Sequence, residues 1–202
     1  MHRRTCTSPE HEFVSRQGRS RFADVAITPD TKDWTWVIER PCAACGFDPS
    51  TVRRDDIADR IARSAVGWDA ALARPEARDR PDEATWSVLE YGCHLRDVHR
   101  IMRERLGLML AQDGAAFANW DQDATAVEDA YGEQDPATVA AELAAEAAAF
   151  AAAYRTVGDD DWARTGLRSN GSAFTVESFA IYALHDLEHH RVDVGLAARP
   201  AD

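Results

Sequence analysis

Four stretches of the chain place apolar residues three or four positions apart, the spacing that puts them on one face of a helix. These stretches cover about residues 51–73, 82–110, 135–156 and 175–198. No stretch shows the alternation of apolar and polar residues that marks a half-buried strand, and no internal repeat is present. The pattern predicts an all-α fold, a four-helix bundle in which each helix buries one apolar stripe.

Local residue choices place the starts of three of these helices. Asp82 follows a proline and is read as the N-cap of the second helix. Asp135 and Pro136 suit the N-cap and first positions of the third helix, and Thr175 is read as the start of the fourth. The first helix, from about residue 51 to 73, is predicted to be continuous.

The chain before the bundle has a different character. Residues 1–30 are polar, arginine-rich and aperiodic, which predicts a flexible N-terminal tail. Residues 31–50 contain Trp34, Trp36 and a Cys-x-x-Cys turn, and we expect them to form an irregular arm, with the two tryptophans anchoring it. The predicted bundle itself covers residues 51–198.

Composition narrows the function classes. A net charge of −12 argues against binding nucleic acid or an anionic membrane surface, both of which need clustered basic residues. No secretory signal is visible, and the longest alanine-rich run is broken by Glu142 and Glu146, so we expect no membrane span. Four cysteines in 202 residues do not resemble a secreted disulfide framework. A cytoplasmic protein is expected.

The fourth helix carries the most informative pattern. His185 and His189 are four residues apart, which places both imidazoles on one helix face, within reach of one metal ion. Ile181 and Val192 share that face, so the pair lies on an apolar stripe. His94 lies on the apolar arc of the second helix. Burying three inward-facing imidazoles costs free energy unless they share a partner, and a metal ion is such a partner. Three histidine ligands leave one coordination position open on Zn²⁺. Ni²⁺ or Fe²⁺ would also suit imidazole ligands.

Other interpretations of these residues stay open at this point. A histidine on an apolar face is often a core residue bonded to a carbonyl group. Asp186 and His190 form a second pair of the same spacing on a neighbouring face. The Cys42-x-x-Cys45 turn is a redox pair, half of a zinc knuckle, or a structural turn, and no second such turn exists in the sequence.

Three segments carry a resemblance to a known family. They are similar to segments of the DinB/YfiT-like superfamily, and the resemblance covers about residues 51–197. The three segments are Tyr91-Gly-Cys-His94-Leu, Asp161-Trp-Ala-Arg-Thr-Gly166 and His185-Asp-Leu-Glu-His-His190. The resemblance implies a four-helix-bundle metalloenzyme that takes one histidine from the second helix and a pair from the last. Those positions map onto His94, His185 and His189. Some relatives place a carboxylate first in the last pair, which leaves His189 versus His190 open.

The resemblance also implies a class of chemistry. Characterised relatives use mycothiol, bacillithiol or glutathione in transferases and isomerases, so we expect a divalent metal, and a low-molecular-weight thiol such as mycothiol or water as the nucleophile. Tyr91 and Glu188, near the ligands, are candidate proton-transfer groups. The expected partners are a small-molecule substrate and a second copy of the chain in a homodimer. The alternative is a non-catalytic, stress-linked metal-binding or dimerisation bundle.

Overall fold

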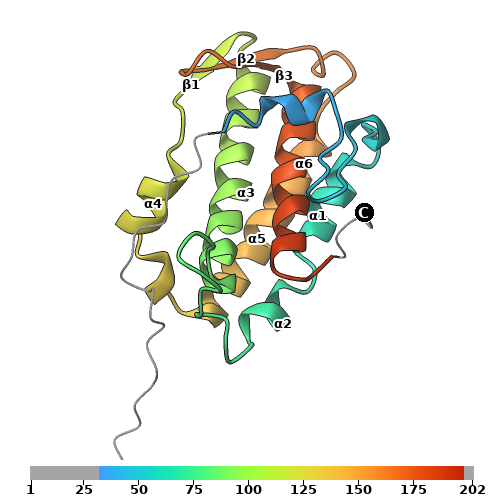
Figure 1. The fold of residues 1–202 in the computed structure, drawn as a ribbon. Coiled ribbons are helices and arrows are strands. Elements are labelled where there is room, and N and C mark those ends of the chain that lie inside the picture. Colours follow the sequence, from blue (N-terminus) through green and yellow to red (C-terminus); the bar gives the residue numbers. More distant parts are fainter. Residues whose placement is uncertain (1–31, 198–202) are drawn as a thin grey trace, which may run out of the picture.

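Four helical segments pack side by side in the computed structural model, which describes residues 32–197 (Figure 1). The predicted tail at residues 1–30 lies outside the described residues. The segments are α1 (Ile57–Ser64) with its short continuation α2 (Trp68–Leu72), α3 (Val88–Ala111), α5 (Pro136–Tyr154) and α6 (Val176–Asp193). α3 contacts α5 and α6, and α1 contacts the same two helices, so the four close a ring around one core. The predicted four-helix bundle is confirmed.

Every helix of the bundle contributes a large side chain to the core. Fully buried examples are Ile61 in α1, Trp68 in α2, Leu106 in α3, Phe150 in α5 and Phe179 in α6. Burying a side chain of this size contributes roughly 1.5–3 kcal/mol. The core therefore fixes the relative positions of the helices that carry the candidate functional residues.

The first predicted helix is interrupted, so the expectation of one continuous helix over residues 51–73 is wrong. α1 ends at Ser64, and α2 begins at Trp68 after Gly67, whose φ is +88°. An α-helix cannot pass through a residue with that φ, and only glycine adopts it at low cost. The apolar spacing still identified the inward face, because Ile61 and Trp68 are both fully buried.

We expect Gly67→Ala to lower the free energy of unfolding by about 1–3 kcal/mol, the usual cost of a non-glycine residue held at positive φ. A Cβ at this position would also lie 3.2 Å from Leu196 Cδ2. Urea unfolding of both proteins measures the difference. Gly107→Ala is the control: Gly107 lies in α3 with nothing within 4 Å of an added Cβ, so that change should stabilise the protein by about 0.5–1 kcal/mol. Equal effects at the two glycines would contradict the prediction.

The second helix begins five residues later than predicted. Ser87, not Asp82, is the N-cap of α3, and its hydroxyl oxygen accepts a hydrogen bond from the backbone N–H of Glu90. The Glu90 carboxylate accepts one in return from the Ser87 N–H, which completes a capping box. Asp82 instead accepts from Ala84 N in a short turn paired with Thr85.

The starts of the other two helices agree with the sequence prediction. Asp135 accepts a hydrogen bond from the backbone N–H of Thr138, and Pro136 is the first residue of α5. Thr175 caps α6 and forms a capping box with Ser178. Both caps satisfy backbone donors that the first turn of a helix leaves without partners.

α5 is apolar and long enough to cross a membrane by length and composition alone. In the structure it packs against α1 and α3, with a row of buried residues along one side. The two glutamates that interrupt its alanine-rich run form ion pairs with α3: Glu142 with Arg96 and Glu146 with Arg103, each at 2.9 Å. α5 is therefore packed as a core helix of the bundle.

A small sheet lies across one end of the bundle, which the sequence analysis did not predict (Figure 1). Its strands are β1 (Ala115–Phe117), β2 (Thr165–Arg168) and β3 (Ala173–Thr175). β1 pairs parallel with β2, and β2 pairs antiparallel with β3. Strands of three or four residues are too short for alternation to be recognised in sequence. Gly166 lets β2 come close to α3, since a Cβ there would lie 2.6 Å from Phe117 and 2.8 Å from Met109.

Two irregular segments complete the described chain and flank α3 and α6. The connection from α3 to α5 contains α4 (Gln122–Glu128) and the 3-10 turn η3 (Tyr131–Glu133). The arm, residues 32–50 of the described chain, contains η1 (Thr35–Ile38) and the start of η2 (Pro49–Thr51). η1 contacts α6, so the arm covers one side of that helix.

Candidate metal centre

His94 is the most unusual side chain in the core. It is fully buried in α3, between the rings of Trp86 and Trp120, whose centroids lie 5.2 and 5.4 Å from its own. The Trp120 ring is nearly parallel to the imidazole, at 7°. Neither ring nitrogen of His94 makes a hydrogen bond within the described residues. The Asp186 carboxylate is near, with Oδ1 3.5 Å from His94 Nε2, but that contact is long for a hydrogen bond. Because buried polar groups are almost always satisfied, this imidazole is poorly satisfied by the protein chain.

Two side chains of α6 face His94. Asp186 Oδ1 lies 3.5 Å from His94 Nε2 and 3.1 Å from His190 Nε2. The His94 and His190 rings meet edge to face, with centroids 5.0 Å apart. One donor atom from each of the three residues lies within 4.8 Å of the others. We call His94, Asp186 and His190 the bundle cluster.

Neighbouring charged groups shift the pKa values of Asp186 and His190 in the bundle cluster. Burial alone would raise the pKa of Asp186, but its contact with His190 at 3.1 Å and the nearby His94, at 3.5 Å, hold it well below its usual value. Burial opposes the charged form of His190, yet the hydrogen bonds from its ring to Asp186 and Asp193 raise its pKa to about 9. His190 Nδ1 lies 2.9 Å from Asp193 Oδ2. The bundle cluster is therefore a group of interacting charges at the edge of the core.

A second group of donor atoms lies on the adjacent side of α6. Cys42 and Cys45 of the arm meet His185 and His189, and one donor atom from each lies within 4.8 Å of the others. We call these four residues the arm cluster. Cys42 and His185 are buried, and Cys45 and His189 are partly buried. Burial raises the pKa of the Cys45 thiol to about 12, which is the reverse of what a reactive redox cysteine needs.

The three histidines that the sequence analysis grouped as ligands lie in two clusters. His94 belongs to the bundle cluster, whereas His185 and His189 belong to the arm cluster. The reason is a rotation of about 100° per residue along the helix. The apolar stripe of α6 that carries His185 and His189 packs against the arm, and the neighbouring face, with Asp186 and His190, is the one that meets His94 on α3.

A cavity of about 360 Å³ lies beside both clusters. Its lining includes Asp186 and His190 of the bundle cluster, His185 and His189 of the arm cluster, and aromatic side chains from the arm, α3 and α6. Trp34 contributes from the arm. Ligand pockets commonly combine an apolar lining with a few convergent polar groups. The cavity therefore gives a small molecule a place to contact the bundle cluster.

The two candidate proton-transfer groups have different surroundings. Tyr91 lines the cavity, and its ring centroid lies 4.8 Å from that of His190. Burial raises the pKa of Tyr91 well above its usual value, so its hydroxyl stays protonated at neutral pH and can donate a hydrogen bond. Glu188 points to α1, where both of its oxygens accept hydrogen bonds from Arg60, at 2.8 and 2.9 Å. Glu188 is not among the described residues that line the cavity.

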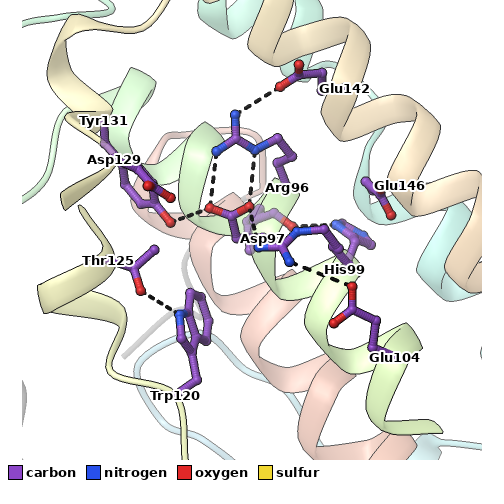
Figure 2. Close-up of polar contacts among 12 residues, drawn as sticks. Arg96, Asp97, His99, Glu104, Trp120, Thr125, Asp129, Tyr131, Glu142 and Glu146 are labelled. Atoms are coloured by element: carbon purple, nitrogen blue, oxygen red, sulfur yellow. Dashed lines mark hydrogen bonds and ion pairs between the residues drawn. The ribbon is translucent and has the colours of Figure 1, made fainter. Parts of the chain in front are cut away.

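A polar network lies on α3 one turn after His94 (Figure 2). Asp97, one turn after His94, is buried and accepts hydrogen bonds from Arg96 and from the Tyr131 hydroxyl, the latter at 2.5 Å. Tyr131 in turn packs against Trp86, at 6.5 Å between ring centroids, and Trp86 packs against His94. The network thus helps to fix the aromatic side chains around His94.

The arm cluster combines two motifs that the sequence analysis considered separately. The Cys-x-x-Cys turn and the His-x-x-x-His pair were both recognised, but 147 residues separate Cys42 from His189. Spacing alone could not show that the arm folds back onto α6. The available signal was chemical, since two thiols and two imidazoles make a complete ligand set for zinc.

Comparisons with known proteins agree with this architecture. The model of the DinB superfamily matches residues 69–192. Among solved structures, YfiT from Bacillus subtilis is similar over 74% of this chain and 92% of its own, with a TM-score of 0.64 and 18% sequence identity. YfiT is described as a probable metal-dependent hydrolase with an unusual four-helix bundle topology. At this identity the likeness shows a shared fold. No functionally curated protein matches the chain.

Proposed function

Because this chain belongs to the DinB superfamily, we propose that it is a divalent-metal-dependent enzyme whose metal ion is held by the bundle cluster. The ligands are His94 from α3 and Asp186 and His190 from α6. This set replaces the one with His185 and His189 as the candidate catalytic site, because those two histidines lie with the arm cysteines.

One observation carries the proposal. His94 is fully buried, its ring is held between two tryptophans, and neither of its nitrogens has a hydrogen-bond partner in the described chain. A histidine left unsatisfied in this way costs free energy, of the order of 1–3 kcal/mol for each buried polar group. A metal ion between His94, Asp186 and His190 would remove that cost at the His94 nitrogen that binds it. Two imidazoles and a carboxylate also suit a catalytic ion, since three protein ligands leave positions for substrate.

The ion supplies Lewis acidity and lowers the pKa of a water or thiol that binds beside it. The side chains of the protein position the metal ligands and the substrate. Asp193 accepts a hydrogen bond from His190 Nδ1, which leaves Nε2 as the ligand atom of that ring. Trp86 and Trp120 hold the imidazole of His94 and keep water from its faces. Tyr91, beside His190, is placed to donate a proton to a substrate atom in the cavity.

The cavity limits the substrate to a small molecule, because about 360 Å³ is near the lower end of the range for ligand pockets. The nucleophile is water or a low-molecular-weight thiol. The description of YfiT as a probable metal-dependent hydrolase supports water, and the resemblance to thiol-dependent relatives supports mycothiol or a similar thiol. The physiological ion, with zinc first, the cytoplasmic location and the homodimer remain predictions.

The decisive experiment measures bound metal in protein purified without chelator. We expect His94→Ala to lose about one equivalent of metal relative to the wild type, since a ligand set of two weakens binding sharply. Elemental analysis and calorimetric titration of Zn²⁺ into chelator-treated protein give the stoichiometry. Turnover is then measured on ester, amide and electrophile panels, with and without thiols, under Zn²⁺, Ni²⁺ or Fe²⁺.

His99→Gln is the matched control. His99 lies on the same helix and is also fully buried, but its ring nitrogens are paired, with Leu95 O at 2.6 Å and Ser64 Oγ at 3.1 Å. This variant should melt at a lower temperature and keep its metal. If His94→Ala and His99→Gln keep the same metal content, the bundle cluster is not a metal site. If the metal is bound but no panel shows turnover, the protein is the non-catalytic bundle of the alternative hypothesis.

A further inference from the structure

We propose that the arm cluster is a second metal site, a closed Cys₂His₂ zinc site that fastens the arm to α6. Its ligands are Cys42 and Cys45 of the arm and His185 and His189 of α6. This site is separate from the bundle cluster and does not depend on the proposed enzymatic function.

The distances fit a tetrahedral ion. Zinc bonds of about 2.0–2.1 Å to nitrogen and 2.3 Å to sulfur place neighbouring ligand atoms roughly 3.3–3.8 Å apart. Cys42 Sγ lies 3.9 Å from His189 Nδ1, and all four donor atoms lie within 4.8 Å of one another. Small side-chain movements therefore bring the four donors to bonding distance of one central point.

His185 supplies an independent indication of a ligand. Only 5% of this residue is exposed, and its Nε2 atom is buried without a hydrogen-bond partner in the described chain. Its ring is fixed by aromatic neighbours, stacked on Trp34 at 5.4 Å and edge-on to Phe47 at 5.5 Å. An imidazole that is buried, immobilised and unsatisfied next to two thiols is accounted for by a shared cation.

The turn that carries the cysteines is shaped to present both sulfurs. Gly46 adopts a φ of +79°, and its N–H donates to Cys42 O at 2.7 Å, which closes the turn. The next N–H, of Phe47, points at Cys45 Sγ at 3.5 Å. A backbone N–H directed at a cysteine sulfur is a contact of the kind that orients metal ligands.

Asp193 stands behind the other end of the site. Its Oδ2 atom lies 3.7 Å from His189 Nε2, while His189 Nδ1 faces Cys42. This contact is an ion-pair distance and is too long for a hydrogen bond, and the same Oδ2 atom accepts one from His190 Nδ1 at 2.9 Å. The 3.9 Å distance to Cys42 Sγ is what identifies Nδ1 as the His189 atom directed at the sulfurs.

The donor types indicate zinc in a structural role. Two thiolates and two imidazoles in tetrahedral order select zinc, and four protein ligands leave no position for a substrate. A Cys42–Cys45 disulfide is the competing use of the sulfurs. It would leave His185 Nε2 without its partner, so the geometry favours the ion.

The zinc site would hold one wall of the substrate cavity. Trp34 and Ala44 line that cavity from the arm, whereas most of the remaining lining comes from the bundle. Fastening the Cys42–Cys45 turn to α6 keeps Trp34 against His185 and His189. Loss of this ion should therefore release the arm and leave the bundle folded, because the bundle core contains its own large buried side chains.

Cobalt substitution tests the proposal. Protein is purified with a phosphine reductant, stripped with chelator and titrated with Co²⁺. We expect a thiolate-to-cobalt charge-transfer band together with the intense visible bands of tetrahedral cobalt. Cys42→Ser and Cys45→Ser should each abolish the charge-transfer band and lower the metal content by about one equivalent, as should His185→Ala. Added Zn²⁺ should displace the cobalt signal, and binding of either ion to the metal-free protein should release about two protons from the thiols.

Two controls separate this site from the bundle cluster. Cys93→Ala removes a buried cysteine outside both clusters, whose sulfur faces Tyr131 O at 3.7 Å, and should leave the charge-transfer band intact. His94→Ala should also keep the band, even if it loses the other ion. The two proposals therefore fail independently.

A chemical measurement on the wild-type protein keeps the test valid if a variant misfolds. Zinc should protect Cys42 and Cys45 from alkylation at least tenfold relative to chelator-treated protein, as read by mass spectrometry of each peptide. Equal alkylation with and without zinc would overturn the proposal. So would a Cys42–Cys45 disulfide that persists in the reductant, or a charge-transfer band that survives Cys42→Ser.

Discussion

Replacing Glu90 by alanine is expected to lower the free energy of unfolding by about 3–5 kcal/mol, because the change breaks a buried ion pair with Arg80. Only 5% of Glu90 is exposed. Its carboxylate forms a two-pronged ion pair with Arg80 and also accepts hydrogen bonds from Ser87 N, at 2.9 Å, and Ser87 Oγ, at 2.7 Å. Alanine removes the ion pair and the capping box at the start of α3 together.

The matched control is Glu177→Ala. Glu177 also makes a two-pronged pair, with Arg54, but their side chains are 42% and 51% exposed. Exposed pairs contribute about 0.2–1 kcal/mol, since water solvates both partners after the pair is broken. Urea unfolding monitored by far-ultraviolet circular dichroism gives both free energies. Similar losses in the two variants would show that the buried pair contributes no more than a surface one.

Asp97→Asn is the second change with a large expected effect, about 3 kcal/mol of unfolding free energy at pH 7. Asp97 is 3% exposed and is paired with Arg96, Arg100 and the Tyr131 hydroxyl (Figure 2). Burial alone would raise its pKa, but the hydrogen bonds from Arg96 and Tyr131 hold the pKa below its usual value. Asparagine keeps the shape and loses the charge, so Arg96 is left only partly neutralised.

This second variant also has a pH signature. A carboxylate whose pKa is lower in the folded state stabilises the fold fully above its unfolded pKa, about 3.9, and the contribution is lost as the pH falls through the folded value. The difference between wild type and Asp97→Asn should therefore be constant from pH 7 to about pH 5 and shrink below about pH 4. Unfolding free energies across that range test this. A difference that stays constant to pH 3 would assign the loss to packing.

The sequence predicted the parts of the fold that depend on residues close in the chain. The caps at Asp135 and Thr175 involve contacts within three or four residues, and the apolar stripes depend on helical periodicity alone. Gly67 could not be identified as a helix break, because a glycine inside a periodic segment is often tolerated. The capping choice between Asp82 and Ser87 was missed for a related reason. Both residues are good N-caps, and the buried partner Arg80 of Glu90 decides between them.

The candidate site was predicted less completely than the fold. The spacing of His185 and His189 correctly put both rings on one buried side of α6, and His94 was correctly placed on an inward face of α3. The sequence could not show which segment of the chain packs against each face of α6. The prediction assumed that the apolar stripe of α6 faces α3, whereas the arm covers that stripe through contacts more than a hundred residues apart in the chain.

Because both clusters lie on α6, the helix fixes the distance between them. His185 and His189 on one face and Asp186 and His190 on the next are offset by a single residue, a rise of about 1.5 Å in an α-helix. A continuous helix is stiff, so α6 keeps the two sets of donor atoms at a constant spacing. The interval between the two sets is therefore fixed by the helix itself. A charge bound on one face therefore acts electrostatically on the donor atoms of the other face at a constant, short distance.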